Sequence, residues 1–446
     1  MRKETDSLGS VNLPDDALYG INTARAMENF GPCEKKTSRD LINSIVMIKK
    51  AAAKAYIALG ADDEEKERAI VAACDGILRG DGDFDDAFAL SAFQGGAGTS
   101  TNMCVNEVIA NLALKKLGYE CGRYDIIHPL DRVNRGQSTN DVYPTALRIA
   151  AIGKLRILSD ECAALQRALQ EKENEWEDVN KLGRTELMDA VPVTLGDEFG
   201  AYAQAVARDR WRLYKIEERL RQVNIGGTAV GLASGKNKKY RVLVLEELRR
   251  ETGYGLAAAE YPMDITQNND VFVEVSGLLK ALAVNLMKIS NDMRILGSGP
   301  NGGIGELSLK PLQQGSTIMA GKVNPVIPEM TIQCSIRVIG NDASITAAAG
   351  RGELELNAFL PLIAECLLES LDLLISSVRA FREKCVIPAR AREDRCRQNL
   401  ECSAAFAASY VPVLGYDMVS ETIKNNSPGK AEELLKETAK KAGENV

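Results

Sequence analysis

Apolar residues recur at helical spacing through the middle of the chain. The longest series advances in alternating steps of three and four residues, which forms one stripe along a helix: Phe272, Val275, Leu279, Leu282, Leu286, Ile289, Met293 and Leu296. A second series keeps this spacing with one acid in it: Phe199, Tyr202, Val206, Asp209, Leu213, Ile216, Leu220 and Val223. A shorter third series comprises Leu155, Leu158, Cys162, Leu165 and Leu169. These patterns predict long helices packed in a bundle.

Two further helices are expected at about 332–349 and 353–382, and segments with the alternation of a strand are few and short. The predicted fold class is therefore all-α. We expect three domains: a mostly helical region over 1–139, the helix bundle over 140–392, and a small helical region over 393–446. The stripes are longer than a bundle of one chain needs, which favours association of several chains, although a core within one chain also explains them.

Composition narrows the functional classes. The 446 residues are 45% hydrophobic and carry a net charge of −7, with lysine and arginine scattered along the chain, so nucleic acid is not an expected partner. No run of eighteen apolar residues and no apolar signal segment occur, which predicts a cytoplasmic protein outside the membrane. The ten cysteines include no CxxC pair and are expected to be small buried side chains. The single histidine, His128, excludes multi-histidine zinc sites; we expect it to be structural and expect no cofactor.

Four polar segments interrupt the helices and carry candidate ligands for an anion. The segment GSTIMAGKVNPVIPE (315–329) contains glycines and prolines that prevent regular structure, so its backbone N–H groups are free to bind a ligand beside its lysine and asparagine. The other three are QGGAGTSTNMCVNE (94–107), RGQSTND (135–141) and GRTELMDAVP (183–192). Each alone also fits an ordinary connection or a helix cap, for which Asn140 or Asp141 is a natural candidate. Together they offer hydroxyls, amides and helix N-termini, which can hold a small dicarboxylate without a metal.

The residues GSTIMAGKVNP (315–325) resemble the signature loop of the aspartase/fumarase superfamily, and the other three loops resemble its remaining shared regions. YGINTARAMENF (19–30) and QNNDVFVEVSGLLKALAVNL (267–286) are similar to its aspartase branch. The resemblance covers roughly residues 8–350. It implies a homotetramer in which five-helix central domains form a twenty-helix core, with each active site built from loops of three subunits.

The resemblance also implies the chemistry, which is the reversible anti elimination of ammonia from L-aspartate to give fumarate through an aci-carboxylate. Ser316 would be the base, acting as an alkoxide. The remaining matching positions would bind the substrate: Thr99, Ser138, Thr139, Asn140, Thr185, Glu186, Thr317, Lys322 and Asn324. Glu329 would pair with Lys322 or begin the next helix as an exposed acid.

Several positions depart from the family pattern. Glu186 stands where the superfamily has histidine or glutamine, which weakens a fumarate hydratase function and places an acid near the substrate amino group. Ala320 replaces a proline, Thr317 replaces a serine, and GPNGGIGE (299–306) lacks the arginine that follows its Gly-Pro in the family. Three alternatives therefore remain: a lyase that adds a different amine to fumarate, a fumarate hydratase, and a catalytically silent oligomeric scaffold.

Overall fold

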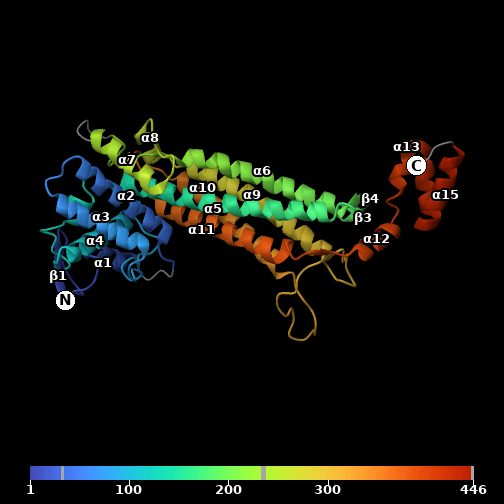
Figure 1. Cartoon of the computed structure of the whole chain (residues 1–446), viewed down its shortest axis with the longest axis horizontal. Coiled ribbons are helices and arrows are strands. Elements are labelled where there is room, and N and C mark those ends of the chain that lie inside the picture. Colours follow the sequence, from blue (N-terminus) through green and yellow to red (C-terminus); the bar gives the residue numbers. More distant parts are fainter. Residues whose placement is uncertain (32–34, 233–237, 443–446) are drawn as a thin grey trace. The chain divides into compact units, whose positions relative to one another are not determined.

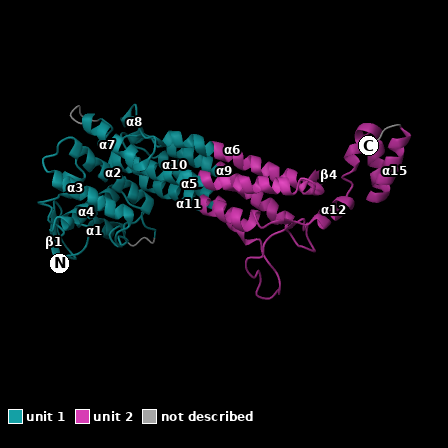
Figure 2. Ribbon diagram, in the orientation of Figure 1, with its two compact units in different colours: residues 1–158, 212–280, 337–373 teal, residues 159–211, 281–336, 374–446 magenta. Residues whose placement is uncertain are grey.

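The computed structural model describes residues 1–31, 35–232 and 238–442, and these residues are mostly helical (Figure 1). Position 33, one of the ten cysteines, lies outside them. The chain forms two compact units, drawn in teal and magenta in Figure 2. Unit 1 comprises residues 1–158, 212–280 and 337–373, and unit 2 comprises residues 159–211, 281–336 and 374–446. The division into three domains stays a prediction.

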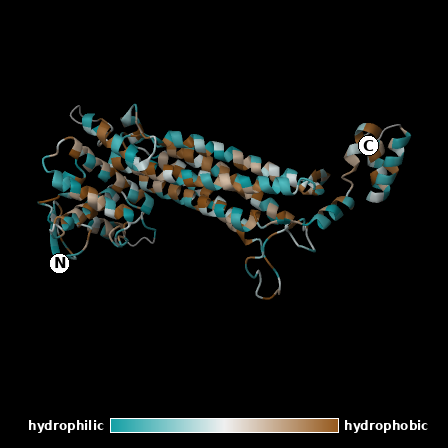
Figure 3. Cartoon of the chain, viewed as in Figure 1, coloured by the Kyte–Doolittle hydropathy of each residue, from teal (hydrophilic) through white to brown (hydrophobic). Residues whose placement is uncertain are grey.

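Five long helices contribute residues to both units: α5 (Thr139–Glu175), α6 (Leu195–Leu220), α9 (Asp270–Leu296), α10 (Val326–Ala349) and α11 (Leu360–Phe381). Every position of the apolar stripe on α9 is buried, with at most 6% of its surface exposed. The stripes on α5 and α6 are buried as well, although Val223 lies beyond the end of α6 in a short strand. Figure 3 shows hydrophobic and polar residues alternating along these helices, as expected of amphipathic helices.

Two predicted helix starts are wrong. α10 begins at Val326 rather than near 332, because Pro328 falls in its first turn, where a backbone N–H has no helical partner to lose. α11 begins at Leu360 rather than at Glu353. Leu354 has a left-handed backbone (φ 52°), and Glu353 pairs with Leu356 in an isolated bridge, so the apolar residues before Leu360 lie in a turn.

The other elements of unit 1 include α2, which contacts α3, α4 and α7. The helices are α1 (Ile21–Phe30), α2 (Arg39–Ala58), α3 (Glu64–Arg79), α4 (Thr99–Lys116), the π-helix η1 (Pro129–Val133), α7 (Lys238–Thr252) and α8 (Pro262–Gln267). The strands are β1 (Arg2–Asp6) with β2 (Gly9–Leu13), antiparallel, and β5 (Gln222–Val223) with β6 (Ala257–Ala258), parallel.

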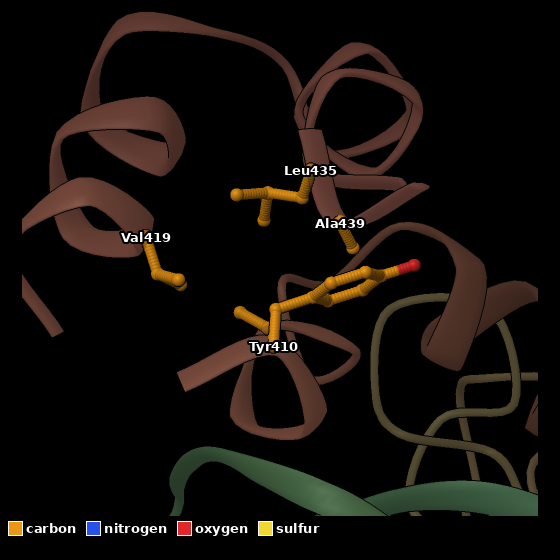
Figure 4. Close-up of a cluster of buried hydrophobic side chains, with 5 residues drawn as sticks. Tyr410, Val419, Leu435 and Ala439 are labelled. Atoms are coloured by element: carbon orange, nitrogen blue, oxygen red, sulfur yellow. The ribbon is translucent and has the colours of Figure 1, made fainter. Parts of the chain in front are cut away.

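Unit 2 adds two antiparallel strand pairs, β3 (Asn180–Thr185) with β4 (Met188–Thr194) and β7 (Leu307–Ser308) with β8 (Arg390–Ala391). Its remaining helices are η3 (Arg382–Val386), α12 (Glu393–Glu401), α13 (Ala407–Leu414), α14 (Tyr416–Asn425) and α15 (Pro428–Lys441). Helices α13 to α15 bury a small apolar cluster of their own (Figure 4): Ala407, Tyr410, Val419, Leu435 and Ala439. Within the described ranges, no helix combines the length and the apolar content that crossing a membrane requires.

Candidate active site

Residues 309–325 connect β7 to α10 as an irregular loop that extends away from the helices of unit 2 (Figure 1). Its base is closed by two hydrogen bonds: Gly315 N donates to Lys322 O at 2.8 Å, and Asn324 Nδ2 donates to Gly315 O at 2.9 Å. A Cβ atom at position 315 would lie 2.7 Å from Lys322 O, so only glycine permits this closure. The loop therefore has a defined shape without helix or strand. We call it the serine loop.

Ser316 is half-buried at the start of the serine loop. Its Oγ accepts hydrogen bonds from the backbone N–H groups of Ile318, at 3.3 Å, and Met319, at 3.0 Å. Hydrogen bonds donated to an oxygen stabilise negative charge on it, so this arrangement favours the alkoxide that a serine base needs. No other hydroxyl of the loop receives two such bonds among the described residues.

Residues of the serine loop line an open cavity of about 540 Å³. Ser316, Thr317 and Lys322 all line it, which brings a hydroxyl pair and a cation to one space. Asn324 lies outside this cavity and uses its amide to close the loop. Glu329 does not pair with Lys322: its carboxylate lies 3.7 Å from Arg294 Nη2, on α9.

The polar segments 94–107 and 135–141 meet in unit 1. Gly98 precedes α4 with φ 89°, and a Cβ there would clash with the ring of Tyr143 at 2.2 Å, so the sharp turn that exposes Thr99 requires glycine. Thr99 donates from Oγ1 to Gly96 O at 2.7 Å. One turn later, Asn102 donates from Nδ2 to Thr139 Oγ1 at 3.1 Å. The two segments are thus joined through buried side chains.

The start of α5 carries the other candidates of unit 1. Ser138 Oγ accepts from Asn140 N at 3.2 Å, and Asp141 Oδ1 accepts from Ser138 N at 2.9 Å, which is a reciprocal cap of the helix. The cap is therefore Ser138 and not Asn140 or Asp141 as predicted, since the helix already begins at Thr139. Asn140 donates from Nδ2 to Ala229 O at 2.8 Å.

A buried lysine supports this helix start and was missed in the sequence. Lys49 on α2 has none of its surface exposed and donates from Nζ to Asn134 Oδ1 at 2.8 Å and to Gln137 Oε1 at 3.0 Å. Burial lowers the pKa of Lys49 to about 7, and the nearby carboxylate of Asp141 opposes that shift. Lys49 lies at helical spacing from the buried residues Ile45 and Ala52, and a cation on the apolar face of a helix is the signal that would have marked it.

Asp141 is fully buried as well, and its carboxylate connects the start of α5 to residues 226–228. Besides Ser138, its carboxylate accepts from Gly226 N at 3.0 Å and Thr228 N at 2.9 Å. Burial raises the pKa of Asp141 to about 7, and these backbone donors act against the shift. Buried hydrogen bonds of Lys49 and Asp141 thus hold the polar segment 135–141 in place.

Residues 183–192 form a β-hairpin rather than the predicted loop. Thr185 pairs with Met188, and Glu186 and Leu187 form a two-residue turn in which both have positive φ, 55° and 66°. Such turns normally contain glycine or asparagine, so the Glu-Leu pair gave no hairpin signal. Arg184 binds Glu306 through two contacts at 2.8 and 3.1 Å, which leaves Thr185 and Glu186 exposed at the tip.

The histidine and the described cysteines have structural environments. His128 Nδ1 accepts from the backbone N–H groups of Leu130 and Asp131 and so caps η1. The nine described cysteines are free, and eight of them are buried or half-buried, as predicted. Within the described ranges, no group of three or more histidine, cysteine or acidic side chains is arranged to hold a metal ion.

Comparisons with known proteins agree with these features. A family model described as Lyase matches residues 9–340. The chain is 43% identical over 419 residues to aspartate ammonia-lyase from Helicobacter pylori, covering 94% of this chain and 89% of the relative. It is 40% identical over 418 residues to aspartate ammonia-lyase from Escherichia coli, covering 93% and 87%.

Solved structures show the same fold. A cobalt-bound fumarate lyase:delta crystallin from Brucella melitensis matches with a TM-score of 0.92 and 42% identity, covering 99% of this chain and 98% of that chain. A recombinant class II fumarase from Schistosoma mansoni matches with a TM-score of 0.91 and 31% identity, covering 97% and 95%.

Proposed function

The chain belongs to the aspartase/fumarase superfamily and is a lyase similar to aspartate ammonia-lyases, and from this premise we propose that it catalyses the reversible anti elimination of ammonia from L-aspartate to give fumarate. The observation that carries the proposal is the environment of Ser316, whose Oγ accepts two backbone N–H hydrogen bonds beside Lys322 in one cavity. A closed loop with a stabilised serine oxygen is the arrangement that proton abstraction by serine requires.

In the proposed reaction, the Ser316 alkoxide removes the proton from the carbon beside the β-carboxylate of the substrate. The electron pair moves into that carboxylate and gives an aci-carboxylate with two negative charges, which must be stabilised by preformed donors. The pair then forms the carbon–carbon double bond as the bond to nitrogen breaks. Ammonia leaves with the electron pair of that bond and takes the proton from the serine.

The hydroxyl groups of the other loops supply donors for the dianion. Thr139 Oγ1 accepts a hydrogen bond from Asn102, and Ser138 Oγ accepts one from Asn140 N, so both hydroxyl protons are free to point to a substrate oxygen. Thr317 would join them, and Thr99 would do so once its hydroxyl proton turns away from Gly96 O, to which it donates in this structure. Lys322 would bind the second carboxylate as a cation, with Thr185 as a donor and Asn324 holding the serine loop in shape.

We include the homotetramer in the proposal. Thr99, Ser138, Thr139 and Asn140 belong to unit 1, whereas Thr185, Glu186 and the serine loop belong to unit 2. Sites built from several subunits would let groups from both units act together. Large apolar side chains exposed on the bundle helices support association: Trp211 and Tyr214 on α6, Val284 on α9 and Ile336 on α10.

The test is an incubation of the purified protein with fumarate and ammonium, with fumarate in buffer alone, and with fumarate and an amine panel, followed by identification of products by mass spectrometry. L-Aspartate from the first mixture supports the proposal. Malate from the second would instead identify a fumarate hydratase. Absence of any product, with Ser316→Ala indistinguishable from the wild type, would identify a silent scaffold.

A further inference from the structure

A second cavity of unit 2, of about 750 Å³, is lined by the serine loop, by the turn after α9, by β7 and by the residue that precedes α12. Its volume is within the range of small-molecule sites, about 300–1,000 Å³. Ser316 does not line it, but Lys322 lines both this cavity and the one that contains Ser316. We call it the basic cavity, because the ionisable side chains that line it are all cations: Lys310, Lys322 and Arg392.

The positive charge of the basic cavity is poorly compensated. The side chains of Lys310 and Lys322 form no ion pair or hydrogen bond with any described residue. The acid beside Arg392 is Asp394, whose carboxylate lies 3.9 Å from Nη2 and is 80% exposed, so this pair contributes little. A cleft lined by charges of one sign attracts ions of the opposite sign. The basic cavity therefore favours an anion.

The backbone of unit 2 fixes Arg392 at this cavity. β7 pairs with β8, with Ser308 opposite Arg390, and Arg392 N donates to Glu306 O at 2.9 Å. Arg392 O in turn accepts from Cys396 N at 2.9 Å, which begins α12. Arg392 thus has a defined position, from which its planar guanidinium can donate to two oxygens of one anion.

Two departures from the family pattern lie in the wall of the basic cavity. Ala320, at the position of the family's proline, lines it. Gly299 and Pro300 line it as well, and they begin the segment that lacks the family's arginine. The wall therefore differs from the family pattern at positions to which the proposed reaction assigns no role.

The remaining wall narrows the class of anion. Leu307, Leu309 and Val323 contribute apolar side chains, and no aromatic side chain is among the described residues that line the cavity. The cavity thus offers no ring on which a nucleotide base could stack. The ligand that fits is a small non-aromatic molecule with at least two anionic oxygen groups, and phosphate esters and polycarboxylates both have this chemistry.

We propose that the basic cavity binds such an anion between Lys310, Lys322 and Arg392, and that the bound anion inhibits turnover by engaging Lys322. The inhibition rests on the proposed function, in which Lys322 binds the second carboxylate of the substrate. Because the same ammonium group serves both cavities, the anion and L-aspartate compete for it.

Binding is tested by calorimetry on the full-length protein, in a buffer of constant ionic strength without divalent metal ions. Inorganic diphosphate is the phosphate probe, and tricarballylate is the polycarboxylate probe. We expect saturable binding, weakened at least tenfold by Lys310→Ala and by Arg392→Ala, because each cation contacts the anion directly. Tighter binding of diphosphate supports a phosphate ester as the ligand, and tighter binding of tricarballylate supports a polycarboxylate. Binding of neither probe overturns the proposal.

Two control variants remove exposed cations of unit 2 that do not line the basic cavity. These are Lys384→Ala in η3 and Arg397→Ala in α12, and both should bind the probes as the wild type does. A loss of affinity in the controls equal to that in Lys310→Ala and Arg392→Ala would indicate attraction by overall charge and would overturn the site. Equal affinity in all variants would place the anion elsewhere and overturn it as well.

Kinetics test the competition for Lys322. The tighter-binding probe should raise the KM for L-aspartate in the wild type and leave kcat unchanged. Without the probe, Lys310→Ala and Arg392→Ala should have the wild-type KM, and with it their inhibition constants should be at least tenfold higher. A changed KM without the probe would make the cavity part of the substrate site and overturn the proposal. A lower kcat at constant KM would overturn the competition.

The two proposals fail in different ways. Deamination of L-aspartate by a protein that binds neither probe leaves the proposed function intact and removes the anion site. Probe binding that depends on Lys310 and Arg392, in a protein that does not turn over L-aspartate, retains the anion site and refutes the proposed function.

Discussion

Asn102 donates a hydrogen bond from Nδ2 to Thr139 Oγ1 over 3.1 Å, and so links the first turns of α4 and α5. Asn102 also donates to Asn134 Oδ1 at 3.2 Å, and that oxygen accepts from Lys49. Because its hydroxyl oxygen is occupied as an acceptor, Thr139 can direct its own proton to a bound anion. A chain of buried polar groups thus sets the direction of one proposed substrate contact.

This link predicts that Asn102 acts through Thr139. Asn102→Ala and Thr139→Val should each raise the KM for L-aspartate, and the double variant should be no worse than the more affected single variant. The coupling expected for one buried neutral hydrogen bond is about 1 kcal/mol, or about fivefold in kcat/KM. A double-mutant cycle on kcat/KM measures it. Fully additive effects would show that the two side chains act independently.

Ser316→Ala should lower kcat by about 100-fold or more, because general-base catalysis contributes on that scale. The side chain is only half-buried, so the fold and the oligomeric state should be unchanged. Steady-state deamination of L-aspartate and size-exclusion chromatography are the two measurements, with Ser344→Ala, at a half-buried helical serine, as the control. Retention of more than a tenth of the wild-type kcat, about 1.4 kcal/mol in barrier height, would exclude Ser316 as the base.

Lys322→Ala should raise the KM for L-aspartate by at least tenfold and also lower kcat, because a charge that faces a dianion is lost from the cavity of the serine loop. Lys310 is an exposed lysine of the same connecting segment but does not line that cavity, and Lys310→Ala should leave both constants unchanged. The same increase in KM in both variants would indicate general electrostatic attraction instead of a specific clamp. Steady-state kinetics at two salt concentrations separates these effects.

The sequence predicted the long helices because their signal is local and repeated. Each stripe contains many apolar positions at one spacing, and burial of those positions, as on α9, stabilises the helix that presents them. The hairpin at 183–192 was not predicted, because its turn depends on positive φ at Glu186 and Leu187, and residues of these types rarely adopt positive φ. The start of α11 was misplaced for the same reason, since Leu354 also has a left-handed backbone.

The candidate site was predicted only where its residues lie in polar loops. Ser316 and Thr139 belong to segments whose glycines and hydroxyls are visible in the sequence. Lys49 lies 85 residues before the group to which it donates, Asn134, and within an apolar helix. Such a contact depends on how α2 packs in unit 1, and no local pattern encodes that packing.

The lowered pKa of Lys49 predicts that the free energy of unfolding increases with pH. Its pKa in the folded protein is lowered to about 7, from an ordinary value of 10.5, so between these values the unfolded chain holds a proton that the folded chain releases. Raising the pH over this window therefore stabilises the wild type relative to Lys49→Met, by at most about 1.4 kcal/mol per pH unit. Denaturant unfolding of both proteins from pH 7 to 10 measures the difference.

The neighbouring lysine provides the control. Burial lowers the pKa of Lys50, but ion pairs with Asp75 and Glu251 outweigh burial and raise it. The contribution of Lys50 is therefore complete below its ordinary pKa and is lost as pH rises through the higher folded value. From pH 7 to 10 the stability difference between wild type and Lys50→Met should therefore stay constant, whereas the difference between wild type and Lys49→Met changes with pH. The same rise with pH for both variants would contradict the assignment of Lys49 as a buried lysine.

Glu306 holds the hairpin of unit 2 in place. It is fully buried, and its carboxylate contacts Lys181 at 3.2 Å, Arg184 at 2.8 Å and Asn399 Nδ2 at 2.8 Å. Burial alone would raise the pKa of Glu306, but these partners outweigh burial and lower the pKa below its ordinary value. The charged form is therefore the one that the folded protein stabilises.

Glu306→Gln should destabilise the protein by about 3–5 kcal/mol at pH 7, because Lys181 and Arg184 would then lie in unit 2 without their shared anion. Since the folded pKa of Glu306 is lowered, its contribution is complete above the ordinary glutamate pKa and is lost as pH falls through the folded value. The difference between variant and wild type should therefore be largest at neutral pH and shrink in acid. Denaturant unfolding at pH 7 and at successively lower pH tests this, with the exposed Glu393→Gln expected to change stability by no more than about 0.5 kcal/mol. A difference that stays constant with pH would mean that the shape of the side chain, and not its charge, holds the hairpin.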